Sequence, residues 1–210
     1  AGRRIVRLDL PGFGGSEPPS RRWDVAGYAF FVHDFATKLN LTVDVLVGHS
    51  FGGRVALKGL GEGILSARRL VLIASAGVAK KKTIKNYIFA ALAKVGRAAT
   101  CVPPLSFFRL PIRRRLYAAL QSDYFAAGPL GPTFRAVVRE DLSEAARAIR
   151  IPTLLIWGEK DAMTPRAEGE RLASLIQGSE LKIFPRAAHF VHHEQPEAVA
   201  RAITIFLHDE

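Results

Sequence analysis

The chain has 210 residues, 49% of them hydrophobic, and its formal net charge is +11 because 30 lysines and arginines outnumber 19 acidic residues. This size and composition predict one globular domain with a large core, interrupted by an inserted subregion. The single cysteine, Cys101, excludes an internal disulfide framework, and no apolar run reaches the ~20 residues that a membrane-spanning helix requires.

The first segments predict a glycine-rich loop and then a helix. The loop PGFGGSEPP, residues 11–19, lacks the Lys-Ser/Thr pair of a phosphate-binding loop, and no helix directly follows its glycines, so we interpret it as structural. Trp23 to Asn40 predicts an amphipathic helix with Asp24 as its N-cap. The buried side of this helix is expected to consist of Tyr28, Phe31, Val32, Phe35 and Leu39.

The stretch VDVLVGHSFGGRVALKGL, residues 43–60, predicts a strand, a sharp corner and a helix. Val43 to Val47 is short, β-branched and apolar, as expected of a fully buried parallel strand. The corner strains the backbone of Ser50 and requires nearly side-chain-free residues two positions before and after it, which are Gly48 and Gly52. The Ser50 hydroxyl then lies at a helix N-terminus, where backbone N–H groups stabilise negative charge, which is typical of a nucleophile.

Gly48 to Gly52, G-H-S-F-G, resembles the nucleophile elbow of the α/β-hydrolase superfamily. The resemblance implies an α/β fold with a mostly parallel sheet flanked by helices, hydrolytic activity without a dissociable cofactor, and the chain order Ser, acid, His. Further strands are expected at Leu70 to Ala74, Thr153 to Trp157 and Leu181 to Phe184. Amphipathic helices are expected at Arg171 to Gln177 and at Glu197 to Leu207, the latter opened by Pro196.

A serine nucleophile needs a base, and the base needs an orienting carboxylate. The resemblance assigns Asp161, in the loop after Thr153 to Trp157, as the acid and His189 as the base, since residues 187–190 match the small-small-His-aromatic pattern of the family. Glu159 is the alternative acid, and His192 and His193 are the alternative bases.

The resemblance also implies that the backbone N–H of Phe51 stabilises an oxyanion, and we expect His49 and Phe190 to line the substrate pocket. No metal site is predicted, because the six histidines lack clustered Cys, Asp or Glu partners at ligand spacing, apart from the run His192–His193–Glu194, which we interpret as a loop.

The start of the chain departs from this family pattern. Ile5 to Leu10 resembles the fourth strand of the family, but the usual hairpin, third strand and loop before it, which supply the second oxyanion donor, have no counterpart. We therefore expect a truncated N-terminal sheet, in which Ile5 to Leu10 either pairs directly with Val43 to Val47 or leaves a gap that another chain fills. Since the only methionine is Met163, the sequence is expected to be a fragment or a processed form.

Residues 77–150 resemble the helical cap insertion of the family, which leaves residues 1–76 and 151–210 as the core. Between Val78 and Arg150 there are 14 lysines and arginines against 4 acidic residues, whereas the remainder of the chain is nearly neutral. The basic cap has two interpretations. In the first, its charge attracts anionic or lipid-like substrates, or an acidic membrane surface. In the second, it is a cap with a solvated basic face. Nucleic-acid binding is not predicted, because the basic residues share their segment with an apolar stripe and no known module is evident.

Together these features predict a serine hydrolase that cleaves small carboxylic esters through an acyl-enzyme on Ser50. Two alternatives stay open: a carbon–carbon bond hydrolase of the meta-cleavage type with the same three residues, and a weakly active or non-catalytic binding module that lacks a complete oxyanion hole. A homo-oligomer is compatible with the sequence, and a cytoplasmic location is the default expectation.

Overall fold

The computed structural model describes residues 4–78, 133 and 137–208. The chain divides into two compact units, one formed by residues 1–79 with 135–210 and the other by residues 80–134. Most of the predicted cap, including Cys101 and its basic stretches, lies outside the described residues. The fold and the candidate site described below belong to the first unit.

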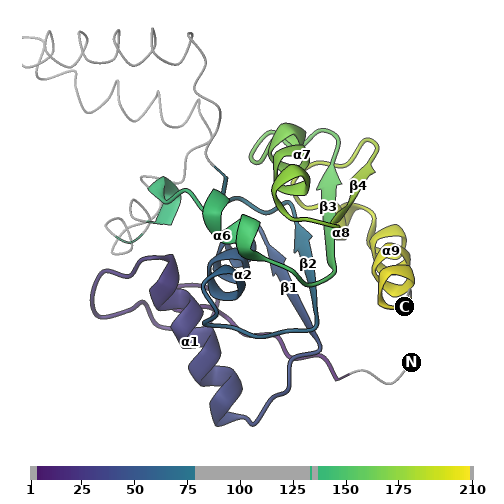
Figure 1. Ribbon diagram of the computed structural model, residues 1–210. Helices are drawn as coiled ribbons and strands as arrows, with labels where there is room; N and C mark the ends of the chain where they lie inside the picture. Colours follow the sequence, from purple (N-terminus) through teal and green to yellow (C-terminus); the bar gives the residue numbers. More distant parts are fainter. Residues whose placement is uncertain (1–3, 79–132, 134–136, 209–210) are drawn as a thin grey trace, which may run out of the picture. The chain divides into compact units, whose positions relative to one another are not determined.

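A parallel sheet of four strands forms the centre of this unit (Figure 1). The strands β1 (Val45–His49), β2 (Arg69–Ile73), β3 (Thr153–Gly158) and β4 (Glu180–Phe184) are neighbours in that order. The side chains of β2 alternate between two buried clusters, with Leu70 and Leu72 in one and Val71 and Ile73 in the other. Because helices cover both faces of a parallel sheet, the sequences of its strands are continuous apolar runs.

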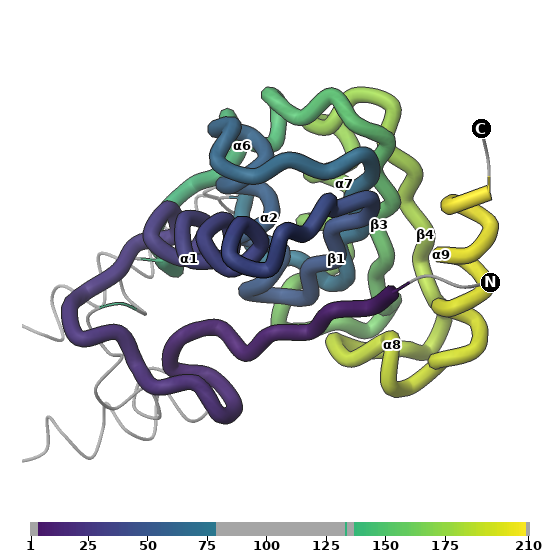
Figure 2. Tube along the Cα trace, turned by 90° about the horizontal axis from the view of Figure 1, so that it is seen from below, coloured from purple at the N-terminus to yellow at the C-terminus, as the bar shows by residue number. Residues whose placement is uncertain are grey.

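Helices form a layer on each face of the sheet (Figures 1 and 2). One face carries α1 (Val25–Lys38), α2 (Phe51–Gly61), α6 (Ser143–Ala148) and α7 (Arg166–Leu175), and the other carries α8 (Val191–Glu194) and α9 (Pro196–His208). No helix in the described part of the chain is both long enough and apolar enough to span a membrane. The fold is the α/β arrangement that the sequence predicts, and α7 begins five residues earlier than expected, directly after Pro165.

The predicted N-cap of α1 is confirmed, because the Asp24 carboxylate accepts a hydrogen bond of 2.9 Å from the N–H of Gly27. The buried side of α1 consists of Val25, Tyr28 and Ala29, with Phe31, Val32 and Phe35 half-buried beside them. The prediction that Leu39 is buried is wrong, because the helix ends at Lys38 and Leu39 is exposed beyond it.

The predicted strand at Ile5 to Leu10 does not form. These residues make no ladder with β1, and Ile5 is 83% exposed. The segment is instead held at its end, where the Tyr28 hydroxyl donates to the carbonyl of Pro11 over 3.1 Å. Direct pairing with β1 is therefore ruled out in this structure, and the alternative, that another chain fills the gap, remains a prediction.

As a consequence, β1 is the edge of the described sheet, and the expectation of a fully buried strand there is wrong. Val47 is 53% exposed, whereas every residue of β3 is buried. An edge strand lacks a neighbour on one side, so its side chains lose cover that the central strands keep.

Residues 142–149 belong to the core, although the predicted cap extended to residue 150. Leu142, Ala146 and Ile149 are buried in the same cluster as α2. Helices α2 and α6 approach closely at Gly61, where an added Cβ would lie 2.3 Å from the carbonyl oxygen of Ala145. The second predicted part of the core therefore begins before residue 151 in the described chain.

Candidate active site

Ser50 occupies a sharp corner between the end of β1 and the start of α2, as its sequence context predicts. Its backbone has φ 50° and ψ −110°, which is a strained conformation for a residue with a side chain. Hydrogen bonds on both sides hold this corner: the N–H of Ser50 donates to the carbonyl of Ile73 over 3.0 Å, and the carbonyl of Ser50 accepts from the N–H of Gly53 over 3.1 Å.

Gly48 and Gly53 allow the close approach of strand and helix at this corner. A Cβ on Gly48 would lie 2.7 Å from the backbone of Gly52 and Gly53, and a Cβ on Gly53 would lie 2.2 Å from the Ser75 hydroxyl. Among the described residues, however, nothing lies within 4 Å of a Cβ on Gly52. The steric role predicted for Gly52 is therefore wrong, and Gly53 has that role, because Gly53 is the residue that approaches Ser75.

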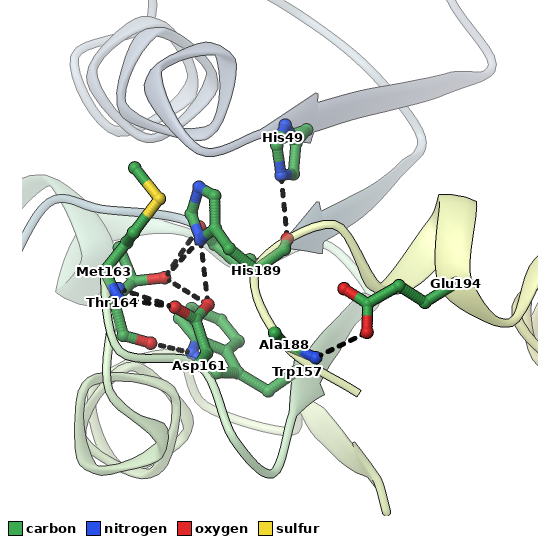
Figure 3. A network of polar contacts seen from close by, with 9 residues as sticks. His49, Trp157, Asp161, Met163, Thr164, Ala188, His189 and Glu194 are labelled. Carbon is green, nitrogen blue, oxygen red and sulfur yellow. Dashed lines mark hydrogen bonds and ion pairs between the residues drawn. The ribbon is translucent and has the colours of Figure 1, made fainter. Parts of the chain in front are cut away.

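Asp161 and His189 come together at the same end of the sheet, from the loops that follow β3 and β4 (Figure 3). Both side chains are buried, and His189 Nδ1 lies 2.9 Å from Asp161 Oδ2. Since an ionised carboxylate only accepts, Nδ1 carries the proton and donates it. The Nε2 atom of His189 is thereby left as the basic nitrogen.

The Asp161 carboxylate accepts from several donors. Its Oδ1 atom accepts from the backbone N–H groups of Met163, over 2.9 Å, and of Thr164, over 2.8 Å, and its Oδ2 atom lies 2.7 Å from the Thr164 hydroxyl. Burial alone would raise the pKa of Asp161, but the hydrogen bonds from His189 and Thr164 outweigh it and hold the pKa below its ordinary value. Asp161 is therefore a buried, charged carboxylate.

The loop that carries His189 is fixed on both sides. The N–H of Ala188 donates to the Glu194 carboxylate over 2.9 Å, as Figure 3 shows. On the opposite side the loop contacts Gly158 at the end of β3, where an added Cβ would lie 2.1 Å from the carbonyl oxygen of Ala188. These contacts set the position of the imidazole at the end of the sheet.

The alternative acid and bases are placed elsewhere. Glu159 accepts from the N–H of Arg186 over 2.9 Å and so joins the loop after β3 to the loop after β4. His193 is exposed, and the ring of His192 packs against that of His49 with centroids 4.5 Å apart. Burial, together with the neighbouring histidines, lowers the pKa of His192 to about 4. Asp161 is the carboxylate that contacts His189.

His49 supports the loop of His189. Its Nε2 atom lies 3.1 Å from the carbonyl oxygen of His189, and the two ring centroids are 4.9 Å apart. A carbonyl only accepts, so His49 donates from Nε2. Burial lowers the pKa of His49, and the hydrogen bond to His189 opposes this shift only in part. The lining of a substrate pocket by His49 and Phe190 stays a prediction, and Phe190 is exposed beside the His189 ring.

The backbone N–H of Phe51 is at the first position of α2, where helix geometry provides no intrahelical acceptor. Its side chain is wedged between the ring of Phe13, at 5.4 Å, and that of Tyr28, at 4.9 Å. In the part of the chain that the structure describes, the Ser50 hydroxyl makes no hydrogen bond to His189. Such contacts are often long without substrate and tighten when it binds.

Sequence reasoning missed Thr164. Its backbone and hydroxyl both contact Asp161, and its carbonyl accepts from Trp157 Nε1 over 2.7 Å. The spacing D-x-x-T, residues 161–164, is a signal for this arrangement, because Asp side chains bind backbone N–H groups two and three residues later. Among the described residues, no group of three or more His, Cys, Asp or Glu side chains could hold a metal ion.

A parallel sheet flanked by helices, with a strained serine corner and a buried Asp-His pair at the carboxyl ends of its strands, defines an α/β hydrolase. The model of the Alpha/beta hydrolase family matches residues 1–202, and the chain belongs to that family.

Relatives and solved structures agree with this assignment. An uncharacterised protein of Mycobacterium tuberculosis is 29% identical over 223 residues, and the alignment covers 91% of this chain but 64% of that protein. A hydrolase from Pseudomonas aeruginosa superposes with a TM-score of 0.67 and 26% identity, covering 96% of this chain and 78% of its own. A thermophilic esterase from Thermogutta terrifontis superposes with a TM-score of 0.64 and 26% identity, covering 95% and 77%.

Proposed function

We propose that this chain is a serine hydrolase that cleaves carboxylic esters through an acyl-enzyme on Ser50. The observation that carries the proposal is the buried hydrogen bond of 2.9 Å between Asp161 and His189, at the end of the sheet where the strained Ser50 follows β1. The likeness to an esterase at 26% identity favours esters as the substrate class.

In the proposed mechanism the Ser50 oxygen attacks the ester carbonyl carbon while His189 Nε2 accepts the hydroxyl proton. The charged Asp161, which holds Nδ1–H, stabilises the imidazolium that forms. The N–H of Phe51 donates to the oxyanion. The tetrahedral intermediate collapses, the alcohol leaves with the proton from His189, and water then attacks the acyl-enzyme with His189 again as the base.

The test is hydrolysis of p-nitrophenyl butyrate by the chain and by two serine variants. Ser50→Ala removes the proposed nucleophile, and Ser66→Ala, at an exposed serine after α2, is the matched control. A parallel reaction with an alkyl fluorophosphonate, followed by peptide mass spectrometry, reports whether Ser50 itself reacts. We expect hydrolysis and labelling in the native chain and in Ser66→Ala, and neither in Ser50→Ala.

Equal rates in all three proteins would contradict the proposal. Labelling of Ser50 without ester hydrolysis would also overturn the ester assignment, and it would favour the carbon–carbon bond cleavage that the same three residues can perform.

A further inference from the structure

The Thr164 hydroxyl is a buried polar group at the centre of the candidate active site that the mechanism above does not use. Thr164 is 5% exposed, and its Oγ1 atom lies 2.7 Å from Asp161 Oδ2 and 3.2 Å from His189 Nδ1 (Figure 3). The same atom lies 3.2 Å from the carbonyl oxygen of Ala74. It is thus in contact with the acid, the base and the end of β2 at once.

The hydroxyl has one proton, so only one of these contacts can be a donated hydrogen bond. The Asp161 carboxylate is charged and is 0.5 Å nearer than the Ala74 carbonyl. Hydrogen bonds to ionised acceptors are shorter and about twice as strong as neutral ones. The proton therefore goes to Asp161, and the lone pairs of Oγ1 are left facing Nδ1–H of His189.

This assignment completes the set of donors around the carboxylate. Two backbone N–H groups donate to Oδ1, while Thr164 and His189 donate to Oδ2. Each oxygen of Asp161 then accepts two hydrogen bonds. These bonds fix the plane of the carboxylate and spread its negative charge over four donors. The lowered pKa of Asp161 agrees with this arrangement, since hydrogen bonds from Thr164 contribute to it.

We propose that Thr164 is a positioning residue of this site, whose hydroxyl orients the Asp161 carboxylate and moderates its attraction for the charged form of His189. The part of this proposal that concerns turnover rests on the proposed function. The part that concerns the hydrogen bond does not, because it describes the Asp161–His189 pair itself.

The test compares three threonine variants. Thr164→Val removes the hydroxyl with little change of shape, and Thr164→Ser keeps it. Thr153→Val is the matched control, because Thr153 is also buried and its hydroxyl donates to a backbone carbonyl, that of Ile151, at the far end of β3. Should Thr164→Val not fold, as judged by thermal melting, Thr164→Ala removes the hydroxyl without adding a methyl group near the carboxylate.

The first readout is steady-state hydrolysis of p-nitrophenyl butyrate. We expect kcat of Thr164→Val to fall roughly 10- to 100-fold with KM unchanged, because Thr164 orients the acid but does not touch the substrate. Without the Thr164 hydroxyl, Asp161 attracts the charged form of His189 more strongly. The pH below which kcat/KM declines should therefore be higher in Thr164→Val than in the native chain. The other titratable groups near His189, which are Asp161, His49 and His192, are the same in every variant. Thr164→Ser should keep both kcat and the pH dependence of kcat/KM close to those of the native chain.

The second readout is the proton NMR signal of His189 Nδ1–H, measured in the Ser50→Ala background, where no turnover is needed. The signal should move downfield in Thr164→Val, because a less satisfied carboxylate accepts more strongly, and it should stay in place in Thr164→Ser and Thr153→Val. An unmoved signal in Thr164→Val would overturn the proposal. If the ester proposal fails, this readout still decides the role of Thr164.

Discussion

At the scale of single residues, His49 links the corner at Ser50 to the loop that carries His189. It follows Gly48 in β1, and it donates to the carbonyl of His189 over 3.1 Å. We expect His49→Ala to lower kcat about 10-fold, since one hydrogen bond that holds the loop is lost. His49→Gln, which keeps an N–H donor, should recover part of the loss. The measurement is ester hydrolysis, with His33→Ala on the exposed side of α1 as the control. Full activity in His49→Ala would show that the carbonyl needs no donor.

A second prediction concerns how His192 makes the stability of the fold depend on pH. Burial and three neighbouring histidines lower its pKa from an ordinary 6.5 to about 4, so the unfolded chain binds a proton that the folded chain does not between these values. The contribution of His192 to stability must then fall as pH drops from about 6.5 to 4, and this contribution changes no further below about pH 4. Allowing for solvent screening, the loss is on the order of 1–2 kcal/mol.

The check is the melting temperature against pH for the native chain, His192→Gln and His208→Gln. His208 lies exposed at the end of α9, so its replacement should leave the curve unchanged. His192→Gln should flatten the curve between about pH 4 and 6.5. A slope equal to that of the native chain would mean that His192 is protonated alike in both states.

At the scale of secondary structure elements, the packing of α2 against Ser75, in the segment after β2, depends on Gly53. We expect Gly53→Ala to destabilise the fold by about 1–3 kcal/mol, because its Cβ would overlap Ser75. Gly52→Ala should be neutral or stabilising by up to about 1 kcal/mol, since its Cβ meets open space and alanine favours the helix. Denaturant unfolding of both variants measures the difference. Equal stabilities would show that α2 shifts to accept the methyl group.

The same two glycines show why local rules predict some features and not others. The strained corner at Ser50 follows from its own neighbours, and so the sequence predicts it. Whether Gly52 or Gly53 needs to lack a side chain depends on the position of Ser75 in space. Ser75 is 22 or more residues away in the chain, and the tertiary fold sets its position. The failed strand at Ile5 to Leu10 has a related cause, because a strand needs a partner, and apolar sequence alone does not provide one.

At the scale of the whole molecule, the order of the strands places Asp161 and His189 in contact. Asp161 and His189 follow neighbouring parallel strands, whose carboxyl ends share one edge of the sheet. Thr164 was not predicted, because its hydroxyl bonds depend on the rotamer that the surrounding packing selects. The end of the predicted cap was misplaced because α6 is short and polar in part, and only its contact with α2 shows that it belongs to the core.

The charge of the whole chain leads to the last prediction, which rests on the proposed function. The net charge is +11, and between Val78 and Arg150 there are 14 basic against 4 acidic residues. A field of this sign raises the local concentration of anionic substrates, and salt screens it over about 8–10 Å at physiological ionic strength. We therefore expect kcat/KM for mono-p-nitrophenyl succinate to fall several-fold when salt rises from about 20 mM to about 500 mM. The matched neutral ester, p-nitrophenyl butyrate, has an acyl chain of the same length and should change less than about twofold. Equal salt dependence of the two esters would contradict the attraction of anionic substrates by the basic residues.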